Sequence, residues 1–465
     1  QDFIAEQVAG VFGTDAAKID RNTSLTNIGL DSLMAIELMN RIESSLGINL
    51  PMSAVLNGPN IIELSEPILV LLEKTGDGDL GDGATAAGHG AGAVEKSGGG
   101  SEVFPLSEGQ RALWFLHLLA PESSAYNLVF SGKLTPLVEI DSMKRAFASL
   151  FERHPMLDVT FETDENGEPR QRLQRGRTID FRATDATAMS ETEILELMAE
   201  HADQPFDLEN GPVVRLELFR TAENAHMVLL SMHHIMSDAW SIAILFSDLI
   251  ESYFSYKAGL NPDYSSTSGH NYEDYVNWEK KQLGTISGEA YRNYWERELD
   301  GAPVILDVPT DHPRQPIQTF NGGTHTFHVD PDLAAKLVSL SKKENVTLFS
   351  TLLASFNALM HRYCNQDDIL IGTALAGRTE RAFRDVIGYF VQPQPLRSRA
   401  GEDPVFADFL HDTAGTVIGA IDNQNYPLTR IIEDVQAPRD PSRSPLFQVL
   451  FSMESTPNAD AEGLA

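Results

Sequence analysis

The chain lacks most of the features that mark secreted and membrane proteins. Cys364 is its only cysteine, which excludes a disulfide framework and a cysteine-rich metal site. No apolar run reaches the roughly 18–20 residues that cross a bilayer. The amino terminus has no basic segment followed by an apolar one, as a signal peptide would. We therefore expect a cytoplasmic protein.

Positive charge is also scarce. The 465 residues include 35 Lys and Arg against 67 Asp and Glu, which gives a formal net charge of −32. Phosphate backbones and anionic lipid surfaces both require clustered basic side chains. The charge balance therefore argues against nucleic acid and membranes as partners. It favours solubility, or docking onto basic surfaces of partner proteins.

One stretch has almost no bulky side chains. Residues 75–101 consist mostly of Gly, Ala and small polar residues. Such a composition cannot build a core and is typical of a flexible linker. The chain is also too long for one ordinary core. We therefore expect a small domain over residues 1–74, a linker over 75–101, and a larger part from residue 102 onward.

The part before the linker is predicted to be a small bundle of helices. Ile4, Val8 and Val11 recur at helical spacing. Asp31 is placed to cap a second helix and Asn60 to cap a last one. Little in this part resembles a strand, so an all-α fold is expected.

The part after the linker has a mixed pattern. Strand-like runs at residues 226–231 and 368–373 alternate with amphipathic helices expected near 240–256 and 348–362. Mixed helices and strands indicate α/β layering. A segment of this length has room for two lobes.

Ser32 stands at the first turn of the second expected helix, in the run Gly29-Leu30-Asp31-Ser32-Leu33. The N-terminus of a helix favours a bound phosphate, through its free N–H groups and its dipole. A phosphodiester on this serine would therefore be well placed. Asp and Ser are also the commonest helix caps, so these residues alone fit plain capping as well.

The same run, continued to Leu38, resembles the carrier domains of polyketide synthases and nonribosomal peptide synthetases. The resemblance covers residues 1–74 and implies an all-α four-helix carrier. It also implies that Ser32 bears 4′-phosphopantetheine, whose thiol holds an acyl group as a thioester. The form Gly-Leu-Asp-Ser-Leu is closer to the polyketide type, which implies a polyketide or fatty acyl donor. A phosphopantetheinyl transferase would be a partner.

Two adjacent histidines, His233 and His234, end an apolar strand and precede a helix. Neighbours in an extended chain point to opposite sides, so one imidazole can enter the protein while the other faces a cavity. A histidine near its normal pKa can accept a proton from an attacking amine or hydroxyl. A structural pair is the alternative, and no metal site is expected, because further ligands are not evident nearby. Asp238 can orient the turn or cap the helix that follows.

The pattern His-His-x-x-x-Asp-x-x-Ser resembles the active-site motif of condensation domains, which have a chloramphenicol acetyltransferase-like fold. Further segments match this family in the expected order: residues 107–116, 153–161, 272–278, 388–391 and 439–446. The resemblance implies an α/β (α+β) domain with an N-terminal lobe over 102–275 and a C-terminal lobe over 276–465. It also implies that the second lobe is incomplete at its carboxyl end.

By that resemblance His234 is the catalytic histidine. His233 and Asp238 are implied to be structural, with Arg378 as the expected partner of Asp238. The implied reaction is amide formation between a carrier-bound acyl or peptidyl thioester and an aminoacyl acceptor. The alternatives are ester formation with a hydroxyl acceptor and a non-catalytic platform that recruits proteins. The implied partners are an upstream synthase module and a downstream acceptor carrier.

Four positions depart from the pattern of the family. Ala239 stands where glycine is usual, which adds a methyl group beside the active turn. Asp158 replaces an arginine, and Gln392-Pro393 replaces Asn-Thr. We expect these changes to affect donor and acceptor preference more than the fold.

Overall fold

A computed structural model describes most of the chain. It covers residues 1–454 apart from 13, 26–27, 29, 31–37, 40, 43–44, 47, 49, 51–53, 56–57, 77–93, 95, 97–101, 136–137, 177, 265–268, 402 and 439. Ser32 and most of the predicted linker lie outside the described residues. The chain divides into two compact units. Unit 1 contains residues 1–92, 283–375 and 392–453, and unit 2 is built mainly from residues 93–282 and 376–391.

The amino-terminal part of unit 1 is helical, as predicted. Ile4, Val8 and Leu64 are buried in its core. The Asn60 side chain accepts a hydrogen bond from the Glu63 N–H at 2.9 Å, and the Glu63 carboxylate accepts one from the Asn60 N–H at 2.9 Å. This reciprocal capping box confirms the expected start of the last helix. The described elements are α1 (Asp2–Phe12), η1 (Ala16–Lys18) and α4 (Ile61–Gly76).

The rest of unit 1 packs helices around a two-stranded antiparallel sheet, β8-β9. Trp295, Leu353 and Ile371 are almost fully buried in its core. Residues 301–330, all of them described, contain no helix or strand. The elements are α10 (Ile286–Leu299), α11 (Pro331–Lys343), α12 (Leu348–Cys364), β8 (Asp368–Leu375), β9 (Gln392–Arg399), α13 (Phe406–Asp422) and α14 (Leu428–Asp434).

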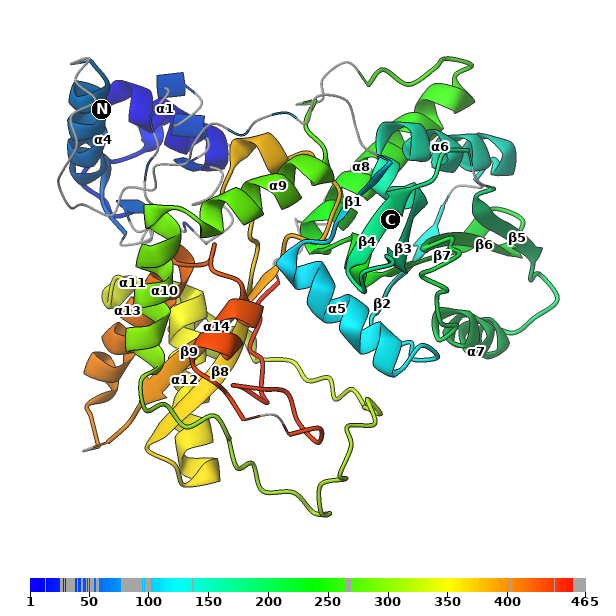
Figure 1. Cartoon of the computed structure of the whole chain (residues 1–465). Helices are drawn as coiled ribbons and strands as arrows, with labels where there is room; N and C mark the ends of the chain where they lie inside the picture. The colour runs from blue at the N-terminus through cyan, green and yellow to red at the C-terminus, as the bar shows by residue number, and fades with distance from the viewer. Residues whose placement is uncertain are drawn as a thin grey trace. The chain divides into compact units, whose positions relative to one another are not determined.

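Unit 2 contains two sheets (Figure 1). One has the strand order β2-β7-β6-β5, in which only the β5–β6 pair is parallel, and the other has the order β1-β4-β3. The strands are β1 (Val103–Pro105), β2 (Asn127–Leu134), β3 (Val159–Thr163), β4 (Pro169–Leu173), β5 (Asp180–Asp185), β6 (Val214–Ala222) and β7 (Ala225–His233). The helices are α5 (Glu108–Leu119), α6 (Ile140–Arg153), η2 (Pro155–Asp158), α7 (Glu191–Ala202), η3 (His234–Met236), α8 (Ala239–Lys257), α9 (Tyr272–Leu283) and η4 (Arg381–Phe383).

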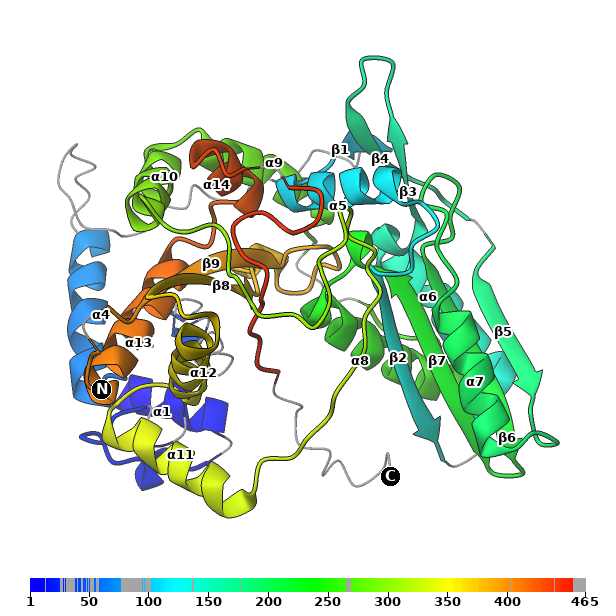
Figure 2. The ribbon, with the colours of Figure 1, turned by 90° about the horizontal axis from the view of Figure 1, so that it is seen from below.

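Helices cover both faces of the four-stranded sheet, with α6 and α8 on one face and α7 on the other (Figure 2). The alternation of side chains along the strands produces these layers. Leu216 and Leu230 belong to the core shared with α6 and α8, whereas Phe219 and Leu229 pack against Ile194 of α7. The predicted α/β layering is therefore confirmed.

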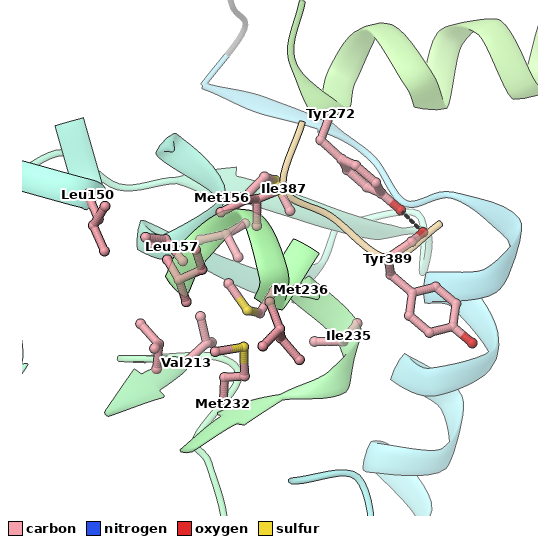
Figure 3. Close-up of a cluster of buried hydrophobic side chains, with 14 of the residues drawn as sticks. Leu150, Met156, Leu157, Val213, Met232, Ile235, Met236, Tyr272, Ile387 and Tyr389 are labelled. Carbon is pink, nitrogen blue, oxygen red and sulfur yellow. Dashed lines mark hydrogen bonds between the residues drawn. The ribbon is translucent and has the colours of Figure 1, made fainter. Parts of the chain in front are cut away.

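A cluster of buried apolar side chains lies beneath the end of β7 (Figure 3). Met232, Ile235 and Met236 come from this strand and the turn that follows it, and none of them is exposed to solvent. They pack in the same core as Leu157 and Val213. The turn that carries the two histidines is therefore attached to a rigid base.

Among the residues that the structure describes, no helix is long and apolar enough to cross a membrane.

Candidate active site

The turn between β7 and α8 brings together the three site residues that the sequence predicted in this part of the chain. His233 ends β7, His234 opens η3, and Asp238 is the N-cap of α8. The His233 N–H donates to the Val213 carbonyl at 3.1 Å, and the His234 N–H donates to the Tyr126 carbonyl at 2.8 Å. The backbone of the turn is thus held from two sides.

His233 points into the protein and is only 3% exposed. Its Nδ1 accepts a hydrogen bond from the Ile235 N–H at 3.1 Å, so this nitrogen carries no proton. Burial above all, together with the nearby His117 and His234, lowers the pKa of His233 to about 3. His233 is therefore a neutral side chain that supports the turn from inside.

His234, the first residue of the turn that follows β7, is half-buried. Its Nδ1 lies 2.8 Å from the carbonyl oxygen of Ser237. Since a carbonyl can only accept, Nδ1 must be the protonated nitrogen of the neutral ring. The lone pair is then on Nε2, for which the described residues provide no hydrogen-bond partner. This tautomer suits a proton acceptor.

The expected ion pair between Asp238 and Arg378 is confirmed. Arg378 Nη2 donates to Asp238 Oδ1 at 3.1 Å, and the arginine and aspartate side chains are 2% and 5% exposed. The same oxygen accepts from the Ser241 N–H at 2.7 Å, and Oδ2 accepts from the Phe390 N–H at 3.0 Å. Asp238 therefore both caps α8 and orients the turn, the two roles that the sequence left open.

Arg378 organises the segment that follows it as well. Its Nη1 donates to the carbonyls of Phe383 and Val386 at 2.6 and 2.7 Å. Its Nη2 donates to Ser241 Oγ at 2.6 Å, and its guanidinium lies 3.9 Å from the centre of the Phe390 ring. Burial lowers the pKa of Arg378, and the charge of Asp238 opposes this effect. The arginine thus ties residues 383–390 to the start of α8.

A second set of hydrogen bonds supports the turn, and sequence reasoning missed it. Gln110 Nε2 donates to the Ile235 carbonyl at 3.0 Å, and Gln110 forms a capping box with Ser107 at the start of α5. Tyr272 donates its hydroxyl to the Tyr389 carbonyl at 2.6 Å, and its oxygen lies 3.0 Å from Ser107 Oγ. The Ser-x-x-Gln pattern predicts the capping box, but nothing in the sequence shows what the glutamine reaches.

Two glycines leave room for these tyrosine rings. A Cβ on Gly388 would lie 2.0 Å from the ring of Tyr272, and one on Gly109 would lie 2.5 Å from the ring of Tyr389. Both separations are far shorter than any normal carbon–carbon contact. The close packing around the turn therefore requires glycine at both positions.

The departures from the family pattern cause no steric conflict in the turn. Ala239 is the first residue of α8 and is exposed, so its methyl group does not compete for space in the core. Asp158 is buried at the end of η2, and Gln392 is buried at the start of β9. Their effect on donor and acceptor preference stays a prediction.

The predicted attachment residue, Ser32, lies outside the described residues. The nearest described neighbours are Leu30, which is buried and outside any helix, and Leu38, which is buried in a helix. Within the described part of the chain, no group of three or more His, Cys, Asp or Glu side chains is arranged to hold a metal ion.

Family models match both predicted parts of the chain. Residues 2–68 match the model described as a phosphopantetheine attachment site. Residues 101–463 match the model described as a condensation domain.

Known proteins of similar sequence and structure agree with this result. One of the linear gramicidin synthase proteins of Brevibacillus parabrevis is 32% identical over 468 residues, which cover 99% of this chain but only 6% of that protein. The crystal structure of holo-AB3403, a four-domain nonribosomal peptide synthetase bound to AMP and glycine, is 25% identical with a TM-score of 0.69. That match covers 77% of this chain and 27% of the other. The X-domain in its complex with OxyB from teicoplanin biosynthesis is 24% identical with a TM-score of 0.69, covers 78% and 79% of the two chains, and shows the fold alone.

The match covers nearly all of this chain but only a small fraction of the gramicidin synthase protein. Condensation domains of nonribosomal peptide synthetases are acyl-transferring enzymes that form amide bonds. The chain belongs to the condensation-domain family, as a didomain whose amino-terminal part is a carrier for covalent 4′-phosphopantetheine.

Proposed function

We propose that this chain forms an amide bond between an acyl or peptidyl group carried on Ser32 and the amine of an aminoacyl thioester on a second carrier. The observation that carries the proposal is the tautomer of His234. Its Nδ1–H donates a hydrogen bond to the Ser237 carbonyl, which leaves Nε2 of this half-buried side chain as the proton acceptor. We assign the catalytic role to His234 and structural roles to His233 and Asp238.

The 4′-phosphopantetheine arm supplies a thiol that holds the acyl group as an activated thioester. The protein then needs no nucleophile of its own. As the amide bond forms and the carbon–sulfur bond breaks, His234 Nε2 takes the proton from the attacking nitrogen and can return it to the departing sulfur. Such proton transfer typically contributes about 10²–10⁴-fold to a rate.

The remaining residues of the turn keep His234 in place. Asp238 and Arg378 fix the start of α8, and Gln110 holds the Ile235 carbonyl. His233 stays neutral because it is buried, so it adds no second positive charge when His234 takes a proton. Positioning of this kind is a large part of what an enzyme contributes when both reactants are tethered.

The proposed partners follow from the two domains. An upstream synthase module would supply the acyl group, a downstream carrier would deliver the acceptor, and a phosphopantetheinyl transferase would modify Ser32. The polyketide-like form of the serine motif favours a polyketide or fatty acyl donor. Ester formation is the closest alternative reaction, because a hydroxyl acceptor would use the same Nε2.

A non-catalytic recruitment platform is the second candidate function. The X-domain from teicoplanin biosynthesis shares the fold and occurs in a complex with the protein OxyB. That likeness supports protein binding by the fold. The presence of His234 with an available Nε2 favours catalysis in this chain.

Intact-protein mass spectrometry tests the proposal directly. Ser32 is loaded with candidate acyl-pantetheines, and amine or hydroxyl acceptors on a second carrier are added. We expect amide product from the wild type and a loss of about 10²–10⁴-fold in rate for His234→Ala. An unchanged rate for His234→Ala would disprove its role, and modification of Ser32→Ala by the transferase would disprove the attachment site. Capture of a partner protein without acyl transfer would support the platform instead.

A further inference from the structure

We propose that Tyr389 is a positioning residue for His234, and that its ring holds the imidazole in the orientation set by the Ser237 carbonyl. The inference rests on the function proposed above and assigns a second side chain to the same site. It starts from one contact, the ring of Tyr389 against the ring of His234.

The two rings meet nearly at right angles. Their centroids are 5.3 Å apart, and their planes are inclined by 75°. This edge-to-face geometry is a favourable arrangement for aromatic rings. The Ser237 carbonyl restrains the imidazole at Nδ1. The contact with Tyr389 is a second restraint on the same ring, and together they limit its rotation.

Tyr389 can act as a restraint because its own backbone is fixed on both sides. Its carbonyl accepts the Tyr272 hydroxyl at 2.6 Å, the dashed bond in Figure 3. The preceding Gly388 N–H donates to Ser241 Oγ at 3.1 Å. The following Phe390 N–H donates to an oxygen of Asp238 at 3.0 Å. Three successive residues are therefore hydrogen-bonded to buried side chains, two of which belong to the histidine turn and its helix.

The Tyr389 ring also packs against α5. The ring is only 8% exposed, and it packs so tightly against Gly109 that no Cβ would fit between them. Figure 3 shows the ring next to this helix and directed away from Met232 and Met236. The ring contacts both α5 and the imidazole, and it has little freedom to move.

The Tyr389 side chain also stays neutral. Burial raises the pKa of its hydroxyl above the ordinary value, and the nearby Tyr126 raises it further. The ring therefore presents no negative charge to His234 at working pH. The ring acts on His234 through packing. We therefore expect loss of the ring to disturb the orientation of His234 more than loss of the hydroxyl group.

Two substitutions at Tyr389 separate the ring from the hydroxyl. Tyr389→Phe keeps the ring, and we expect it to retain at least about a third of the wild-type kcat. Tyr389→Leu removes the ring, and we expect kcat to fall about tenfold or more, because a small misplacement of a catalytic group is costly. The KM for the acceptor should stay within about threefold, since the ring acts on the proton acceptor and not on binding.

Tyr253→Leu is the matched control for loss of a buried tyrosine. Tyr253 is also 8% exposed and lies on α8, with its hydroxyl accepting the Glu139 N–H at 3.2 Å. We expect this variant to lose thermal stability and to keep its kcat. A kcat for Tyr389→Leu within about twofold of the control would overturn the proposal. So would an equal loss for Tyr389→Phe, which would assign the effect to the hydroxyl.

A spectroscopic measurement tests the same idea without turnover. In ¹⁵N-histidine NMR spectra, with His234→Ala used for assignment, the wild type should show His234 as the Nδ1–H tautomer. Tyr389→Leu should move both ring nitrogens toward the mixture of tautomers found in water, and Tyr389→Phe should not. Unchanged His234 shifts in Tyr389→Leu would contradict the proposal. Because this readout needs no substrate, it stays decisive even if the proposed condensation reaction fails.

Discussion

Unit 2 contains two clusters built from the same kinds of side chain, a histidine, an aspartate, an arginine and an aromatic ring. The first lies where α6 ends. His154 Nε2 is 2.6 Å from Asp248 Oδ2, and Arg153 Nε is 2.9 Å from the same oxygen. The guanidinium of Arg153 lies 4.7 Å from the centre of the Tyr264 ring. The charge of Asp248 is thus shared between a histidine and an arginine.

The second cluster is the turn after β7, and its connections differ. Asp238 binds Arg378 and two backbone N–H groups, and Arg378 covers Phe390. His234 makes no bond to this aspartate and uses a backbone carbonyl instead. The carboxylate therefore builds the turn, while Nε2 of the imidazole has no hydrogen-bond partner among the described residues. The two clusters therefore share a composition and differ in the partner of the histidine, which is Asp248 for His154 and the Ser237 carbonyl for His234.

Replacing the histidines gives the largest contrast between the clusters. We expect His234→Ala to lower kcat by about 10²–10⁴-fold with little change in the melting temperature. His154→Ala should leave kcat unchanged and lower the free energy of unfolding by about 1–3 kcal/mol, because Asp248 loses a buried partner. Acyl-transfer kinetics and thermal unfolding of both variants check this. A similar loss of kcat in the two variants would contradict the contrast.

Replacing the arginines tests how strongly each aspartate depends on its partner. Arg378→Ala leaves a buried carboxylate without its cation, and we expect a loss of about 3–5 kcal/mol in urea denaturation. Arg153→Ala should lower the free energy of unfolding by less, because Asp248 keeps His154 at 2.6 Å. The Arg153 side chain is also more exposed than that of Arg378, 11% against 2%. Equal losses of unfolding free energy in the two variants would show that His154 does not stabilise the Asp248 carboxylate once Arg153 is removed.

Acid should act on the turn through His233. Unfolded histidine binds a proton near pH 6.5, whereas folded His233 resists protonation until about pH 3. Between these values the unfolded chain holds the extra proton, so stability is fully present above pH 6.5 and is lost as the pH falls. We expect this residue to account for about 2 kcal/mol of the loss between pH 7 and pH 5.

His233→Asn isolates the contribution of His233, because it keeps an acceptor for the Ile235 N–H and does not titrate. The difference in unfolding free energy between wild type and variant should shrink or reverse as the pH is lowered to 5. A difference that is independent of pH would mean that His233 titrates normally in the folded protein.

The smallest effect is expected at Ala239. Restoring glycine should change kcat by less than about twofold, because the methyl group is exposed at the start of α8. The flexible glycine should cost up to about 1 kcal/mol of stability. Kinetics with acceptors of increasing size provide the check. A gain in kcat that grows with acceptor size would show that the methyl group narrows access to the turn.

Much of the local structure could be predicted from periodicity. The helices expected near residues 240–256 and 348–362 are α8 (Ala239–Lys257) and α12 (Leu348–Cys364). The two strand-like runs fall within β7 and β8. These features depend on neighbours in the chain, and so the sequence displays them.

The hydrogen bonds of the site could not be predicted in the same way. Family resemblance supplied the Asp238–Arg378 pair, whose members are 140 positions apart. The bonds from Gln110 to the Ile235 carbonyl and from Tyr272 to the Tyr389 carbonyl have no sequence signal, because they join side chains to distant backbone atoms. The proposed limits of the two lobes stay predictions.

The separation between Asp238 and Arg378 also bears on how the protein is made. A ribosome adds about 5–20 residues per second, so Asp238 is synthesised roughly 7–28 s before Arg378, which lies 140 positions later. Until then the ion pair at the start of α8 cannot form. Residues 376–391 complete unit 2 only after β8 of unit 1 has been synthesised. The turn that carries the two histidines is therefore completed late in translation, after α6, α7 and the sheet that they cover have been synthesised.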